Sequence, residues 1–181
     1  MKLTDTEMKK LAQEAEAFGF SHAGPVDVTT LAPSQQVRDM CADGKCQYYG
    51  HNWMCPPECG TVEECAGKIG RYESALLVQV TAEMEDEFDA EAIMDAGLRL
   101  KELSAKFHEK MKERFGETML LGVGACNLCA SCAYPKPCRF PDKAVSAMEG
   151  YGLMITEVCS ENGIGYFYGD GTITFHALLL F

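Results

Sequence analysis

Residues 118–141 read TMLLGVGACNLCASCAYPKPCRFP, an apolar segment of strand length that runs directly into a group of four cysteines. Cys126, Cys129 and Cys132 follow one another at Cys-x-x-Cys spacing, and Cys138 comes six residues after Cys132. Two residues between cysteines let the chain curl so that successive sulfur atoms face one centre, which is typical of a loop that binds a [4Fe-4S] cluster. The sequence therefore predicts a buried strand that ends in a metal-binding loop.

Zinc is the main alternative metal for this loop. A tetrahedral zinc site usually takes two Cys-x-x-Cys pairs from separate parts of a chain, whereas three evenly spaced cysteines on one loop do not easily supply four tetrahedral directions. The spacing therefore favours iron–sulfur over zinc. The fourth ligand stays open, because bacterial ferredoxins place their fourth cysteine closer to the third and follow it directly with proline. The proline here is Pro141, so a residue from elsewhere could take the place of Cys138.

A second group of cysteines lies in residues 41–65, CADGKCQYYGHNWMCPPECGTVEEC. Pro56 and Pro57 restrict the backbone beside Cys55 and remove two N–H donors, which fixes the direction of its thiol. Rigid presentation of a thiol suits a metal site, so we expect a second metal centre, either iron–sulfur or zinc. Its predicted ligands are Cys41, Cys46, Cys55 and Cys59. A set of packed reduced thiols is the alternative, and His51 is a reserve candidate for the fourth ligand in place of Cys59.

The length and composition of the chain limit the classes of protein to which it can belong. At 181 residues and 47% hydrophobic, the chain is long and apolar enough to bury a core without metal, and we expect one domain over residues 1–181. A disulfide scaffold with ten cysteines would be shorter and would carry a signal peptide. The N-terminal residues instead have the pattern of an amphipathic helix, and no apolar run is long enough to span a bilayer. We therefore expect a cytoplasmic protein without a membrane partner.

The formal charge of −11 disfavours nucleic acid as a partner. A [4Fe-4S]²⁺ core with four thiolates adds a further charge of about −2. An acidic surface usually serves solubility, and docking to a basic redox partner is the sharper alternative.

Hydrophobic periodicity and turn residues predict the secondary structure. The expected helices span 4–19, 33–41, 61–70, 89–115 and 141–149, and the expected strands span 20–26, 74–82, 118–124, 153–158 and 172–181. The capping boxes Thr4-x2-Glu7 and Thr61-x2-Glu64 begin the first and third of these helices. Met40 of the second helix is expected to point into the core, and Cys65 of the third is expected to be buried and not to bind metal. The strand–helix–strand order over 74–124 implies a parallel crossover, so we expect an α/β fold with a mainly parallel central sheet flanked by helices. The two cysteine-rich metal-binding loops extend from it. The last strand should enter the interior of the sheet, and the stripe of the long helix should pack on the sheet instead of forming a dimer seam.

Several short motifs combine the two cysteine groups with the segments around them. They are Cys41-x4-Cys46, Tyr49-Gly50, Trp53-x-Cys55-Pro56-Pro57, Gly122-x-Gly124-x-Cys126-x2-Cys129-x2-Cys132, Cys138-Arg139-x-Pro141 and Met148-Glu149-x-x-Gly152. Together they cover most of the chain and resemble the DUF2284 family, a cysteine-rich domain of unknown function predicted to bind metal. The resemblance implies a bound metal and gives no reaction.

The predicted function is electron transfer or redox support for a partner protein, because a cluster with four protein thiolates leaves no open iron for substrate. One alternative is an enzyme, either a lyase-type site with an open iron or a cluster-dependent reductase that uses a corrinoid or a flavin. The six-residue segment Gly19-Phe20-x3-Gly24 is similar to the start of cobalamin-dependent iron–sulfur reductases, but six positions are too few to transfer a corrinoid site. A structural zinc protein that acts as an interaction module is the third interpretation.

Overall fold

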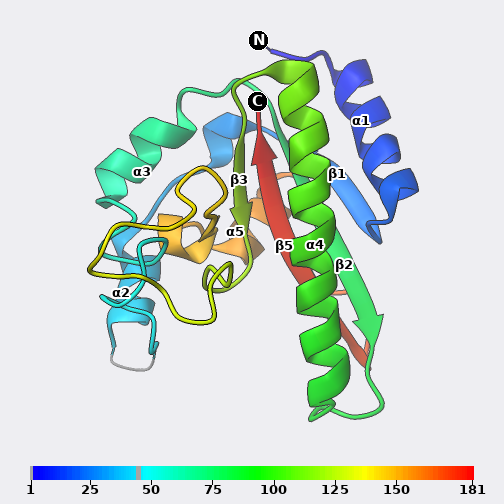
Figure 1. The fold of residues 1–181 in the computed structure, drawn as a ribbon. Helices are drawn as coiled ribbons and strands as arrows, with labels where there is room; N and C mark the ends of the chain where they lie inside the picture. The colour runs from blue at the N-terminus through cyan, green and yellow to red at the C-terminus, as the bar shows by residue number, and fades with distance from the viewer. Residues whose placement is uncertain (1, 44–45) are drawn as a thin grey trace.

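A five-stranded sheet forms the centre of the molecule (Figure 1), in a computed structural model that describes residues 2–43 and 46–181. The spatial order of the strands is β1-β2-β5-β3-β4. Their bounds are β1 His22–Val26, β2 Ala75–Glu83, β3 Met119–Gly122, β4 Ser146–Ala147 and β5 Thr172–Leu180. β1 and β5 both pair antiparallel with β2, and β3 pairs antiparallel with β5. In the described residues, β3 with β4 is the one parallel pair.

The prediction of a mainly parallel sheet is wrong, because the sheet is mixed and mostly antiparallel. β2 and β3 run in the same direction, as the strand–helix–strand order indicated, but they are not neighbours. β5 lies between them, with Leu178 opposite both Leu77 and Leu121. The prediction that the last strand enters the sheet interior is thus confirmed. Its apolar run marked it as buried on both faces, but burial does not determine the direction in which a strand pairs.

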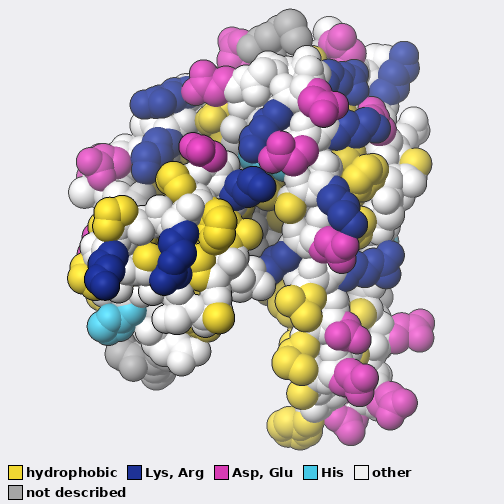
Figure 2. Space-filling view, in the orientation of Figure 1, with side chains coloured by type: hydrophobic (Ala, Val, Ile, Leu, Met, Phe, Trp, Pro, Cys, Tyr) yellow, Lys and Arg dark blue, Asp and Glu magenta, His cyan; other side chains and the backbone are white. Residues whose placement is uncertain are grey.

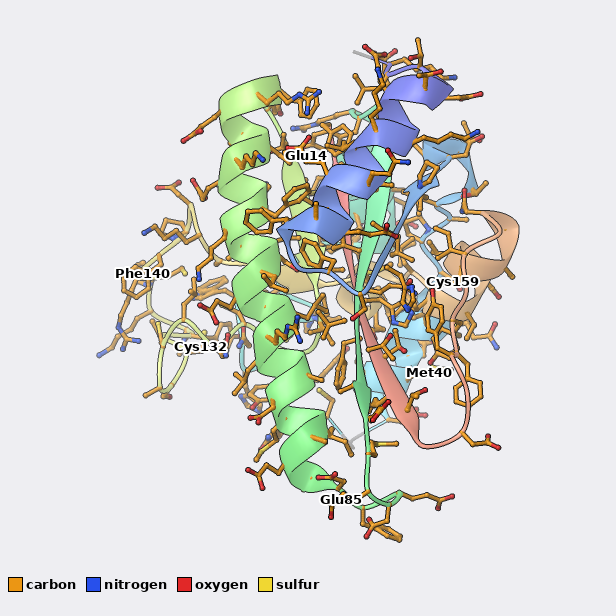
Figure 3. All side chains as sticks on the ribbon, turned by 90° about the vertical axis from the view of Figure 1, so that its right-hand side faces the viewer. Glu14, Met40, Glu85, Cys132, Phe140 and Cys159 are labelled. Carbon is orange, nitrogen blue, oxygen red and sulfur yellow. The ribbon has the colours of Figure 1, made fainter. Side chains whose placement is uncertain are left out.

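The first face of the sheet is covered by α1, Asp5–Phe18, and α4, Ala90–Phe115 (Figures 1 and 3). Side chains that alternate along β2, such as Leu76 and Val78, pack against Leu100 and Phe107 of α4. The α4 stripe is therefore core, as expected. A capping box in which the Thr4 hydroxyl accepts from the Glu7 backbone N–H begins α1 as predicted.

The opposite face is covered by α3, Val62–Ile69, and α5, Ile155–Glu161, with the 3₁₀ turns η1, Val28–Thr30, and η2, Glu149–Tyr151. The other alternate set of strand residues, including Leu77 and Leu178, packs here. α2, Gln35–Ala42, lies beside η2 at the edge of this layer. Among the described helices, none combines the length and the apolar composition that crossing a bilayer requires.

Two predicted elements near the C-terminus are wrong. Residues 141–149 do not form a helix, since Ser146 and Ala147 pair with Leu121 and Gly122 as strand β4 at the sheet edge. Residues 153–158 do not form a strand, because α5 covers most of this segment and buries Val158 and Cys159 against the core. A short apolar run fits a buried strand and a buried helix equally well, so periodicity alone could not separate them.

Candidate metal centres

The first cysteine group lies on the loop after β3, at the edge of the sheet beyond β5 (Figure 1). Its four thiols line one pocket of about 20 Å³, together with the Asn52–Met54 segment of the other cysteine-rich loop. These are the predicted residues Cys126, Cys129, Cys132 and Cys138. All four are half-buried, and Figure 3 labels Cys132 and Phe140, both of which lie on this loop. The structure thus brings the four predicted cysteines together.

Three hydrogen bonds join the two cysteine-rich loops. Asn52, which is buried, donates through Nδ2 to the Cys126 carbonyl at 3.4 Å. The Trp53 indole donates to the Lys136 carbonyl at 2.8 Å. The Tyr134 hydroxyl donates to Oε1 of Glu58 at 3.0 Å, and the Trp53 and Tyr134 rings meet edge to face with centroids 5.1 Å apart. Because each bond links residues far apart in the sequence, the loops form one lobe, which we call the cysteine lobe, residues 41–60 and 124–145.

A second pocket, of about 420 Å³, contains three of the four other predicted ligands. Cys41 comes from the last turn of α2, and Cys46 and Cys55 come from the loop that follows it. Gly44 and Lys45, two of the four residues between Cys41 and Cys46, lie outside the described residues. Met40 lines this pocket and is 57% exposed, so the expectation that it points into the core is wrong.

Cys55 lies between the two groups of thiols. Burial, and then the nearby thiols of Cys46, Cys41, Cys126 and Cys132, raise the pKa of Cys55 to about 12. Burial also raises the pKa of Cys41. Because metals bind thiolates, a metal that binds here has to displace the proton of Cys55.

Cys59 is placed apart from the pocket that Cys41 lines. Its thiol is buried in the core under α3 with Cys65, and it donates to the Gly150 carbonyl at 3.4 Å. A hydrogen bond with Cys65, followed by burial, raises the pKa of Cys59. His51 is exposed and lines neither pocket. The assignment of Cys59 as a ligand stays a prediction, and Cys65 is buried as the sequence indicated.

Two charged residues at the site were given no role by sequence reasoning, although Glu149 belongs to the Met148-Glu149-x-x-Gly152 motif. Glu149, on η2, lines the second pocket, and burial raises its pKa. Its Oε2 atom is buried and has no hydrogen-bond partner among the described residues. Lys101, on α4, donates to the Ala125 carbonyl at 2.9 Å; burial lowers its pKa, while Cys126 and Cys55 oppose that shift. The sequence did not indicate that these two charged residues lie beside thiols, because only the tertiary fold buries them there.

The cysteines are not gathered around a single point. Among the described residues, no three His, Cys, Asp or Glu side chains are arranged to hold one metal ion.

Comparison with known proteins supports the metal-binding interpretation. No curated protein and no solved structure matches the chain. Residues 25–181 match the family described as predicted metal-binding protein, DUF2284. The matched range includes both cysteine groups and leaves out only α1 and the start of β1. The match covers nearly the whole chain, and the chain therefore belongs to the DUF2284 family of predicted metal-binding proteins.

Proposed function

We propose that the loop after β3 binds a [4Fe-4S] cluster through Cys126, Cys129, Cys132 and Cys138, and that the protein exchanges electrons with a partner protein. The observation that carries this proposal is the one pocket that all four thiols line. In a cubane cluster each thiolate binds a different iron, so the sulfur atoms need not converge on one point as they do around zinc.

Electron transfer follows from the number of ligands and from their position. Four thiolates occupy all four irons, so no iron is left to bind a substrate, and the group can only gain and lose electrons. The four cysteines are half-buried on a surface loop, which a partner protein can approach closely. Lys101 adds a positive charge near Cys126, which favours the reduced, more negative cluster.

The exposed side chains of the cysteine lobe favour an acidic partner protein. Lys136, Arg139 and Lys143 are exposed on the loop, and Leu128 and Phe140 are 47% and 45% exposed beside them. Figure 2 shows hydrophobic and basic side chains over the lobe, while acidic side chains gather at the far end of α4. The net charge alone pointed to a basic partner, but the surface around the cluster loop favours one that presents carboxylates and apolar groups.

Anaerobic purification tests the cluster. We expect a brown protein in which the loop contributes about four iron and four acid-labile sulfide per chain. Cys129→Ser should lower both, whereas Cys159→Ser, a matched change at a cysteine of α5 that is buried in the core, should leave them unchanged. Stoichiometric zinc without sulfide after anaerobic iron–sulfur reconstitution would show instead a structural zinc protein.

A further inference from the structure

The pocket that contains Cys41, Cys46 and Cys55 has room for a group much larger than one ion. Its volume is about 420 Å³, while about 10–15 Å³ on the same measure is enough to hold one water molecule. The two pockets are also adjacent, since Met54 lines both and the consecutive residues Ala125 and Cys126 line one each. A cofactor in this pocket would therefore lie beside the cluster of the β3 loop.

Three thiols supply three corners of a cubane cluster, and the fourth predicted cysteine does not line the pocket. The Cys59 thiol is in the core and is already used as a donor to the Gly150 carbonyl at 3.4 Å. The neighbouring residue, Glu149, does line the pocket. Its buried Oε2 atom has no hydrogen-bond partner among the residues that the structure describes. A buried carboxylate oxygen without a donor is costly, so the group either takes up a proton or binds a cation.

We propose that Cys41, Cys46 and Cys55 hold a second iron–sulfur cluster whose fourth iron faces the carboxylate of Glu149 instead of a cysteine. The proposal rests on the proposed function for its iron–sulfur chemistry and adds a second centre with a different role. A carboxylate is a harder and more easily displaced ligand of iron than a thiolate, so this iron can exchange ligands. The first cluster would pass electrons to it across the shared wall of the two pockets.

The walls of the pocket indicate which ligands could reach this iron. Val37, Met40, Tyr48 and Tyr49 line the same space, and the side chains of Met40 and Tyr48 are 57% and 42% exposed. The site therefore fits a small molecule with an apolar or aromatic body and one oxygen, nitrogen or sulfur atom that binds the iron.

Iron content and electron paramagnetic resonance of the anaerobically reconstituted full chain test the proposal. We expect about eight iron per chain in the wild type and about four in Cys55→Ser. Cys59→Ser should keep the wild-type iron content. Glu149→Gln should also keep it, but the signal of the reduced second cluster should change and should shift further when imidazole or 2-mercaptoethanol is added. Glu157→Gln, on the exposed side of α5, is the matched control and should behave as the wild type.

Three outcomes overturn the proposal. If Cys59→Ser loses as much iron as Cys55→Ser, with a normal circular dichroism spectrum, then Cys59 is the fourth ligand. If the Glu149→Gln signal equals that of the wild type with and without both probes, then Glu149 does not face iron. If wild type and Cys55→Ser both contain about four iron, then the second cluster is absent and the proposed function of the first remains. An absence of sulfide from every sample overturns both.

Discussion

At the scale of single residues, His176 is a buried imidazole outside the metal centres. It is 3% exposed in β5, opposite Gln79 of β2, and its ring stacks on that of Tyr166 with centroids 5.1 Å apart. Its Nε2 atom has no hydrogen-bond partner among the described residues. Burial lowers the pKa of His176 from 6.5 to about 4, because the charged ring would lose its water without gaining a partner.

This shift predicts loss of stability in mild acid. Between pH 6.5 and about 4 the unfolded chain binds a proton at His176 that the folded chain does not, so the free energy of unfolding falls as the pH falls. The full loss for this group is about 3 kcal/mol, since one pKa unit corresponds to about 1.4 kcal/mol. Urea unfolding of the wild type and of His176→Gln at pH 7 and pH 5 measures it. The variant should lose less stability between these pH values, and an equal loss in both proteins would contradict the assignment.

Residue type was a good guide to the site only where the chemistry is rare. Cysteines at short, regular spacing could be recognised in the sequence because few other roles require them. The positions of Glu149 and Lys101 beside the thiols could not be predicted, although Glu149 is part of a sequence motif, since each is one of many charged residues and only the folded chain buries it there. Cys59 shows that closeness in the sequence can also mislead. It is four residues after Cys55, but its thiol is in the core and not in the pocket that Cys55 lines.

At the scale of elements, Gly152 joins the two segments that carry Cys41 and Glu149. The Ser34 N–H, at the start of α2, donates to the Gly152 carbonyl directly after η2 at 2.8 Å. Gly152 has a φ of +83°, and a Cβ atom there would lie 2.8 Å from the backbone N and O of Ser34. A side chain at this position is therefore strained in conformation and also clashes with backbone.

Gly152→Ala should lower both the stability of the fold and the metal content of the second centre. The left-handed conformation alone costs about 1–2 kcal/mol, and the clash moves α2 away from η2 and hence Cys41 away from Glu149. Gly163→Ala is the matched control, because Gly163 has a φ of +65° but nothing within 4 Å of its Cβ position. Chemical denaturation and iron analysis of both variants separate the two effects. Both variants strain the backbone, but only Gly152→Ala also clashes with Ser34. Equal losses in the two variants would show that the contact with Ser34 does not matter.

Local signals predicted elements well when they came from backbone chemistry. The capping boxes at Thr4 and Thr61 begin α1 and α3 as expected. Sheet direction and the segments 141–149 and 153–158 were predicted wrongly, because they depend on partners far away in the sequence. β4 exists only because β3 offers a free edge, and α5 forms where one side of a short segment can bury Val158 and Cys159.

At the scale of the whole molecule, the densest group of acidic residues lies away from the candidate metal centres. The net charge is −11, and acidic residues are dense at the start of α4 and in the loop before it, residues 85–95. The stretch from Cys126 to Val145 has three basic residues and one acidic residue, Asp142. The sequence predicted an acidic protein, but it could not predict that the cysteine lobe faces solvent with basic and apolar groups, because that depends on which side of the loop is exposed.

This separation predicts how electron transfer depends on salt. An acidic acceptor such as flavodoxin should be attracted to the cysteine lobe, so its rate of reduction by the cluster should fall as ionic strength rises and screens the attraction. Reversing Lys136 and Arg139 to glutamate should slow the reaction tenfold or more at low salt, which is the lower end of the effect that electrostatic steering has on association. Stopped-flow mixing of dithionite-reduced protein with flavodoxin measures the rate.

The matched control reverses the charges of Lys9 and Lys10, which are exposed on α1, so both double variants have the same net charge. If the two double variants slow the reaction equally, total charge governs the encounter and the cysteine lobe is not the docking surface. Faster reduction of basic cytochrome c than of flavodoxin at low salt, with a rate that falls as salt is added, would instead favour a basic partner attracted by the acidic remainder of the molecule.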